Sequence, residues 1–575
     1  MRFLTLILTM CVLGGSALAQ AHVPSKVDVS FNRYYDFDEI ENLLHQFARE
    51  YPDLVTLESL GKSEQGREIW LAIVNPKRGL AHTDKPAMFI DGNIHGNEIQ
   101  AAEVVLYTLW YLTKSYGQIE SLTSLMDRCA FYLVPVQNPD SRAWWFSKPS
   151  SPHSPRGNQR PHDDDGDGLI DEDGPDDLDG DGSITQMWVR DPDGEWIRDQ
   201  WDDRIFRRVP AGKKGEWTRL GQEGIDNDGD GRINEDDTTA EDMNRNWPGD
   251  WKPNYVQGGA GPHPLSSPET RAVAEFVLAH PNIGGYQSYH NAGGMMLRGP
   301  GAAYRENFYG RSDLNAYDEI GRTGEQLLPY YRYLVIYRDL YGVHGGEVTW
   351  AAESLGIVAF TNELWTADKY FQREGGADEE RMWVWRDRLD FGQTFTPYTE
   401  VDHPQYGKVL VGGLNKWSSR NTPTFMLEEE CHRNFAFTMF HAEQLPSVKF
   451  GGLTLNQLGD RLWEVTVSVE NESRIATRLE LMARRGIGLS DRLEVELPAG
   501  ARVVTSGSIR SRRDVQMNEV RFEPGRVLLD GGVPGRGQIL HRFIIDAAPG
   551  TKATLRFTSQ RAVDIQRELT LELVR

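Results

Sequence analysis

The chain has 575 residues, of which 39% are hydrophobic and 26% charged, and its 85 acidic and 62 basic side chains give a formal net charge of −23. This length predicts two or more domains, and a charge this negative argues against a nucleic-acid partner or an anionic membrane surface, because both favour clustered Lys and Arg. The 16 Trp, 21 Tyr and 22 Phe residues argue against a disordered chain.

The N-terminus has the pattern of an export signal. Met1 and Arg2 precede an 11-residue apolar run at 3–13, and residues 17–19 (Ala-Leu-Ala) have the small-x-small form of a signal-peptidase site. The apolar run is shorter than the roughly 20 residues that a membrane-spanning helix needs, and no later stretch approaches that length. We therefore expect residues 1–19 to be a cleaved signal peptide and the mature chain to be secreted, extracellular or periplasmic, without a membrane span.

Residues 34–140 alternate between helical and strand-like patterns. An amphipathic helix is predicted at 37–50, where four large apolar residues share one stripe. Strands are predicted at 54–57, 68–74, 88–90 and 130–136, and a second helix at 98–112. Alternation of this kind is typical of an α/β domain with parallel strands.

The acid excess is concentrated in one region. Residues 163–181 contain ten Asp and one Glu without any Lys or Arg, and residues 226–237 contain six acids and one Arg. Both stretches lie in a Gly-, Pro- and Asp-rich region, 141–243, that shows little periodicity. We predict that this region is a long insertion in the α/β domain, whose patterns resume from 269 to 441.

One short pattern occurs three times in these acidic stretches. Carboxylates at positions 1, 3 and 5 are followed by Gly at position 6, which is the arrangement that an oxygen-ligated Ca²⁺ loop needs. No copy has Glu at position 12, so these are not EF-hands, and the alternative is a plain solvated acidic loop. We expect structural Ca²⁺ loops that keep the insertion ordered. The expected ligands are Asp163, Asp165, Asp167 and Asp171 in the first loop, Asp177, Asp179 and Asp181 in the second, and Asp226, Asp228 and Asp230 in the third.

The last 130 residues have a different character. From 446 onward, apolar and polar residues alternate in short runs, which Gly and Pro separate. This period-two alternation predicts a small antiparallel β-sandwich at 446–575, after a larger domain at 20–445. Cys129 and Cys431 both lie in the larger domain, and their spacing allows either a disulfide or two buried thiols.

Residues with metal and proton chemistry follow one another along the larger domain. His95 and Glu98 lie where a predicted strand gives way to a helix, and such a pair, with a second His, forms a catalytic zinc set that leaves one position open. Each of the other motifs is weakly specific by itself. They are Asn138-Pro139-Asp140, Asp242-Met243-Asn244-Arg245-Asn246-Trp247-Pro248, His290 after Gln287-Ser288-Tyr289, Tyr341 before Gly345-Gly346, and Glu363 in Phe360-Thr361-Asn362-Glu363-Leu364.

In their order and approximate spacing, these motifs resemble the zinc metallocarboxypeptidase family, which includes carboxypeptidases A and B. The resemblance covers about residues 34–440 and implies an α/β fold with a mixed, mostly parallel sheet flanked by helices. It implies that His95, Glu98 and His290 bind a catalytic Zn²⁺. It also implies that Glu363 accepts a proton from the attacking water and later gives it to the leaving amine.

The same resemblance implies how a substrate is held. Asn244 and Arg245 match the pair that binds the terminal carboxylate, a task that suits the two parallel hydrogen bonds of a guanidinium. Tyr341 matches the mobile tyrosine that closes over the bound peptide. Val348 matches a position that helps to set the side-chain preference, and an apolar residue there argues against selectivity for Lys or Arg.

The arginine that stabilises the transition state is less well defined by the sequence. In the family it follows the Asn-Pro-Asp turn closely, whereas an insertion follows that turn here. Arg156 and Arg160 are both candidates for the catalytic role, and the distance from Asn138 favours Arg156.

We therefore predict a secreted, calcium-stabilised zinc carboxypeptidase, which hydrolyses C-terminal residues from peptides by means of a zinc-activated water and the Glu363 base. One alternative is a zinc amidase that acts on cell-wall peptides. Another is a catalytically silent, calcium-dependent binding protein on the same scaffold, but the presence of all three ligands and of the base argues against it. The sequence leaves the natural substrate and the oligomeric state open.

Overall fold

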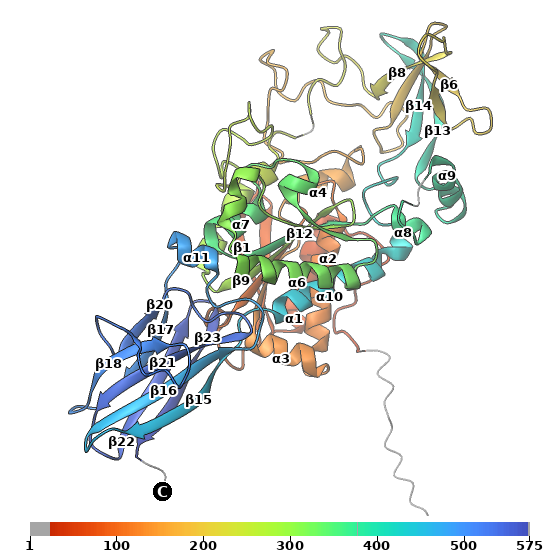
Figure 1. The fold of residues 1–575 in the computed structure, drawn as a ribbon. Coiled ribbons are helices and arrows are strands. Elements are labelled where there is room, and N and C mark those ends of the chain that lie inside the picture. The colour runs from red at the N-terminus through yellow and green to blue at the C-terminus, as the bar shows by residue number, and fades with distance from the viewer. Residues whose placement is uncertain (1–22, 238, 376–377, 573–575) are drawn as a thin grey trace, which may run out of the picture.

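The computed structural model describes residues 23–572 except 238 and 376–377. A central α/β domain carries a β-rich insertion at one end and a C-terminal β-sandwich at the other (Figure 1). The expected signal peptide at 1–19 lies outside the described residues. Within the described ranges, every helix is too short or too polar to cross a bilayer.

An eight-stranded mixed sheet forms the centre of the α/β domain. Its strands, in their order across the sheet, are β1 (Val55–Lys62), β2 (Glu68–Val74), β4 (Ala130–Val134), β3 (Ala87–Gly92), β9 (Ile283–Asn291), β12 (Val358–Leu364), β10 (Met295–Arg298) and β11 (Arg332–Val335). The four middle strands, β4, β3, β9 and β12, are parallel. Every residue of β3, β4 and β9 is buried, which explains why these segments read as continuous rather than alternating apolar runs.

Helices pack around this sheet, and the predicted helix at 37–50 is confirmed with the same bounds. Asp36 and Glu39 form a capping box at its start, and its apolar stripe is buried. The helices are α1 (Phe37–Glu50), α2 (Gln100–Ser115), α3 (Glu120–Arg128), α4 (Pro139–Ser147), α5 (Pro268–Ala279), α6 (Arg311–Leu327), α7 (Glu347–Leu355), α8 (Asp368–Phe371), α9 (Glu379–Arg388), α10 (Leu427–Glu443) and, in the C-terminal region, α11 (Glu480–Arg485).

Both cysteines of the α/β domain are free thiols. Cys129 follows α3 and Cys431 lies on α10, and neither side chain is exposed. Burial raises the pKa of Cys129 to about 11, so this thiol is inert at neutral pH. Of the two possibilities that the sequence left open, the structure has the buried thiols.

A second sheet, which the sequence did not predict, combines four strands of the insertion with a hairpin at 395–414. Its six strands are β13 (Phe395–His403), β14 (Gly407–Leu414), β5 (Gln186–Arg190), β8 (Trp217–Gln222), β6 (Trp196–Arg198) and β7 (Phe206–Arg208). Four of these strands, β5 to β8, lie within 141–243, where the sequence shows little periodicity. They are short, and β5 pairs with β14, which lies more than two hundred residues later in the chain, so local periodicity carries little of the signal.

The C-terminal region is the predicted β-sandwich. One sheet contains β15 (Val448–Gln457), β16 (Leu462–Asn471), β21 (Gly537–Asp546), β18 (Arg502–Ile509) and β19 (Asn518–Glu519); the other contains β20 (Arg526–Leu529), β17 (Asp491–Glu496), β22 (Thr551–Ser559) and β23 (Ala562–Leu571). Alternate residues of β16 and β17 enter the shared core, as the period-two pattern indicated.

The sandwich is fixed to the α/β domain by a buried arginine. Arg561 donates to the carbonyl oxygen of Leu355 at 2.7 Å and to that of Gly356, at the C-terminal end of α7. Cations stabilise this end of a helix because its last carbonyl groups lack partners within the helix. Burial lowers the pKa of Arg561 to about 10, so the side chain remains charged at neutral pH.

We expect Arg561→Met to lower the free energy of unfolding by about 2–4 kcal/mol, because it removes charged hydrogen bonds from buried carbonyl groups. Denaturant unfolding followed by tryptophan fluorescence measures this change. Arg556→Met in the same sandwich is the control, because the Arg556 side chain is 43% exposed and pairs with Glu496 at 3.5 Å. An equal effect of the two substitutions would contradict the role of Arg561.

Candidate active site

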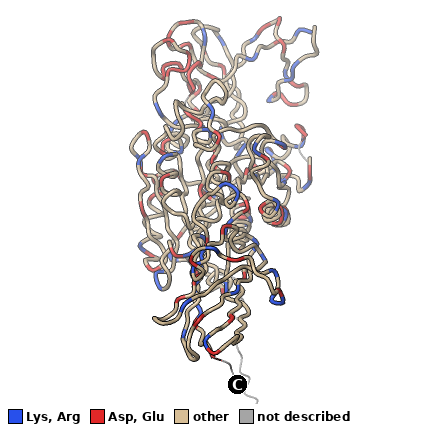
Figure 2. The backbone as a smooth tube through the Cα atoms, turned by 60° about the vertical axis from the view of Figure 1, so that its left-hand side comes forward, with Lys and Arg blue, Asp and Glu red and all other residues tan. Residues whose placement is uncertain are grey.

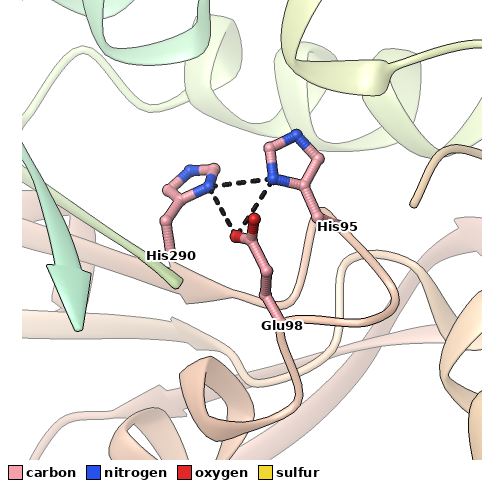
Figure 3. Close-up of side chains that lie close together, drawn as sticks. All are labelled: His95, Glu98 and His290. Atoms are coloured by element: carbon pink, nitrogen blue, oxygen red, sulfur yellow. Dashed lines mark hydrogen bonds and ion pairs between the residues drawn. The ribbon is translucent and has the colours of Figure 1, made fainter. Parts of the chain in front are cut away.

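Three side chains converge at the carboxyl-terminal edge of the parallel strands (Figure 3). His95 Nδ1 lies 3.0 Å from Glu98 Oε2, His290 Nδ1 lies 3.1 Å from the same oxygen, and the two Nδ1 atoms are 3.2 Å apart. His95 and Glu98 occupy the turn between β3 and α2, and His290 is the penultimate residue of β9. The helix begins at Gln100 and not at residue 98 as predicted, so His95 and Glu98 both lie in the turn that precedes it.

This donor set fits zinc. Bonds of 2.0–2.1 Å to a tetrahedral ion place its ligand atoms about 3.3 Å apart, close to the separations of these three atoms. Two imidazole nitrogens and one carboxylate oxygen are also the donor chemistry of catalytic zinc, which keeps a fourth position open. All three side chains are almost completely buried.

The outer ring nitrogens of both histidines have partners that fix their orientation. His95 Nε2 lies 3.0 Å from Asp242 Oδ1, and His290 Nε2 lies 3.3 Å from Ser288 Oγ. The Ser288 hydroxyl in turn donates to the buried Glu347 carboxylate at 3.1 Å. With Nε2 protonated in both rings, both Nδ1 lone pairs are available to a metal ion.

The structure separates the two candidate arginines. Arg156 bonds Glu98 Oε1 at 3.1 Å and Asp242 Oδ2 at 3.0 Å, so its guanidinium lies at the donor set. Burial alone would lower the pKa of Arg156, but the carboxylates of Asp242 and Glu98 raise it above its ordinary value. Arg160 instead pairs with Glu64 and Glu241 and donates to the carbonyl oxygen of Ser266.

Glu363 is brought to the same site by strand pairing. It lies on β12, where its Cα is paired with that of His290 in the neighbouring parallel strand β9. Burial and the charge of Glu98 raise the pKa of Glu363 to about 7, while His290, Arg156 and Arg420 oppose this shift. A carboxylate with a pKa near neutrality is suited to accept and return a proton.

Asn244, one of the residues expected to hold the substrate, lies beside this centre. Asn244 and Arg245 form the short helical turn after Asp242, and the Asn244 amide nitrogen lies 3.4 Å from His290 Nε2. Val348 is buried on α7, one residue after Glu347. Tyr341 follows a single π-type turn, Ile336–Leu340, and its side chain is 59% exposed.

The acidic loops gather at the end of the molecule that lies opposite the β-sandwich (Figure 2). In each loop the Asp at position 1 accepts hydrogen bonds from the backbone N–H groups of the Gly residues at positions 4 and 6. Carboxylate oxygens of Asp163, Asp165 and Asp167 lie close together, and those of Asp177 and Asp179 lie close to Glu223. The carboxylate of Asp171 accepts from the backbone of His162 at 3.2 Å.

Three residues of these sites escaped the sequence analysis. Asp242 stands two residues before Asn244, so its role as the partner of His95 was accessible from the motif. Glu223 is 44 and 46 residues from Asp179 and Asp177, the residues that it joins, and Arg420, which bonds Glu98 Oε1 at 3.2 Å, lies 57 residues beyond Glu363. No local pattern marks either of them.

The chain belongs to the zinc carboxypeptidase family, whose sequence model matches residues 40–160 and 203–379, more than half of the chain. The unmatched interval 161–202 contains the first two acidic loops. Residues 447–570, which form the β-sandwich, match a domain family of unknown function.

Individual relatives are similar over shorter stretches. Human carboxypeptidase D is 35% identical over 107 residues, which are 19% of this chain and 8% of that protein. An inactive metallocarboxypeptidase of Saccharomyces cerevisiae is 32% identical over 131 residues, 23% of this chain and 30% of that protein. The chain thus spans less than a third of the length of both relatives. Carboxypeptidase A from Helicoverpa armigera, a solved structure, is 18% identical with a TM-score of 0.41, covering 58% of this chain and 66% of that one.

Proposed function

We propose that this protein is a secreted, zinc-dependent carboxypeptidase that hydrolyses the C-terminal peptide bond of its substrates. The observation that carries the proposal is the triangle of two imidazole nitrogens and one carboxylate oxygen, with a second carboxylate, Glu363, on the adjacent strand. Family membership alone is insufficient, because the family includes an inactive relative.

In this proposal, different residues of the chain have different roles in hydrolysis. When bound, zinc supplies Lewis-acid polarisation of the scissile carbonyl group and lowers the pKa of water. Glu363 accepts the proton of the attacking water at its carboxylate and returns it to the leaving nitrogen. Arg156 places its guanidinium beside the donor set, where it stabilises negative charge that develops on the carbonyl oxygen. Asp242 holds His95 in the required tautomer.

Arg245 and Asn244 hold the C-terminal residue of the substrate. A guanidinium and the Asn244 amide bind the carboxylate, which restricts cleavage to the last peptide bond. Tyr341, which is exposed, closes over the bound residue, while Val348 favours an apolar side chain.

The acidic loops bind Ca²⁺ as structural ions in this proposal. Hard oxygen donors at positions 1, 3 and 5 suit calcium, and the repeated bonds to the Gly N–H groups hold the first Asp of each loop in one orientation. Glu223 is fully buried and directly follows β8, and it adds a carboxylate ligand to the second loop. Export to a calcium-containing compartment agrees with the signal-like N-terminus.

Peptide trimming distinguishes an exopeptidase from other zinc hydrolases. We expect mass spectrometry to show stepwise loss of residues from peptides with a free C-terminus. The same peptides with an amidated C-terminus should react at least about 100-fold more slowly, because Arg245 then lacks its charged partner. Internal cleavage, or equal trimming of both forms, would refute the proposal.

A further inference from the structure

Arg420 enters the active site from outside the segment that matches the family. It follows the β13–β14 hairpin, and its Nη1 donates to Glu98 Oε1 at 3.2 Å and to the carbonyl oxygen of Asn291 at 2.8 Å. Its Nη2 lies 3.0 Å from His153 Nδ1, and its side chain remains 23% exposed. The backbone of Arg420 has a φ of 70°, a left-handed conformation that is uncommon for Arg and concentrates at functional sites.

Arg420 is the last of three arginines that a chain of contacts connects and that we call the arginine row: Arg245, Arg156 and Arg420. Asp242 connects the first two: its backbone carbonyl accepts from the backbone N–H of Arg245 at 2.8 Å, and its carboxylate binds the Arg156 guanidinium. Glu98 connects the last two, because its Oε1 accepts from both Arg156 and Arg420. The contacts therefore follow the order Arg245, Arg156, Arg420.

This order corresponds to successive parts of a peptide. If Arg245 holds the terminal carboxylate and Arg156 faces the scissile carbonyl group, the next group along the row faces the residue on the acyl side of the bond. That residue is the penultimate one of the substrate, and Arg420 is the side chain that would meet it.

The net positive charge around the donor set favours the binding of a second anionic group, in addition to the terminal carboxylate of the substrate. With a divalent zinc bound, the metal and the arginine row carry two more positive charges than Glu98, Asp242 and Glu363 neutralise. The terminal carboxylate of a substrate removes one of these. Burial and the charges of Arg420 and Arg156 lower the pKa of His153, which favours its neutral form. An excess charge in a buried site is unfavourable unless a partner is bound.

We propose that Arg420 forms a subsite for a carboxylate on the penultimate residue of the substrate, so that the enzyme prefers peptides with an acidic residue before the one removed. This inference rests on the proposed carboxypeptidase activity. It adds a specificity element on the acyl side of the bond, supplied by a segment outside the matched part of the chain.

The test uses two tetrapeptides that differ only at the penultimate position, Ala-Ala-Glu-Leu and Ala-Ala-Gln-Leu, with release of Leu as the measure of kcat/KM. We expect the zinc-loaded wild type to favour the Glu peptide about tenfold, one charged hydrogen-bonded contact being worth about 1.4 kcal/mol or more. Arg420→Gln should reduce this ratio to about one, and Arg420→Lys should keep part of it, because the charge remains but the fork geometry is lost.

A ratio of two substrates on one preparation does not depend on how much of the variant is folded or loaded with zinc. Arg461→Gln removes one charge from the β-sandwich, where Arg461 pairs with Asp546 at 3.0 Å, and should leave the ratio unchanged. A wild-type ratio of one or less, or a ratio that survives Arg420→Gln, would overturn the inference. Failure of the wild type to release Leu from either peptide would instead refute the proposed carboxypeptidase activity.

Discussion

Glu363→Gln should lower kcat by about 10²–10⁴-fold, the range that general acid–base catalysis contributes. Gln keeps the size and hydrogen-bonding shape of the side chain but has no carboxylate to accept a proton from water. KM should change little, because Glu363 is not among the residues that we assign to substrate binding. Steady-state kinetics on a peptide with a free C-terminus measure both quantities.

The zinc content of the same variant separates catalysis from metal binding. Glu363 lies outside the donor triangle of His95, Glu98 and His290, so the variant should retain one zinc per chain by atomic emission. Glu58→Gln is a matched control, because Glu58 is an exposed carboxylate on β1. A fall in kcat of less than tenfold, or one that follows zinc loss, would contradict the assignment of Glu363 as the base.

Removal of calcium should produce the largest change in stability. Each site that binds only the folded state contributes about 2.7 kcal/mol at a hundredfold excess of the ion over its dissociation constant. Without the ion, the carboxylates of one loop repel each other: burial raises the pKa of Asp179, and the charges of Asp181 and Asp177 raise it further. We expect the insertion to lose its order in the calcium-free protein.

The two metals can be distinguished by reloading. After treatment with EDTA, protein reloaded with zinc alone should melt at a lower temperature than protein reloaded with zinc and calcium, and magnesium should not replace calcium. Asp228→Asn should weaken the calcium response, whereas Asp203→Asn should not, because the Asp203 side chain is 82% exposed and lies outside the loops. Identical melting of the two reloaded forms would refute the calcium sites.

Several parts of the fold could be predicted because their signal is local. The helix Phe37–Glu50 has its cap and its apolar stripe within 15 residues, and strands β16 and β17 alternate with period two. The candidate metal ligands could be recognised as an ordered set, because each stands in a short motif at the end of a strand. Strand pairing then explains why they meet: β3, β9 and β12 are parallel, so their carboxyl ends lie at one edge of the sheet.

The insertion shows where local reasoning fails. Strands β5 to β8 are three to six residues long, and they are stabilised by the distant hairpin β13–β14. Sequence periodicity describes the environment of one segment and contains no information about a partner two hundred residues away.

The sequence by itself determined the residue types of the site, the β-sandwich and the three acidic loops, because each depends on neighbours within about 15 residues. Only the tertiary structure decided that Arg156 rather than Arg160 reaches Glu98, and that Asp242 orients His95. It alone also shows that Glu223 belongs to the second acidic loop and that Arg420 belongs to the candidate active site. The reason is physical: these contacts depend on where the whole backbone brings side chains that are far apart in the chain. The net charge of −23 is unevenly distributed: acidic residues are concentrated in the insertion at one end of the molecule, whereas Arg156 and Arg420 contact Glu98 at the candidate metal site.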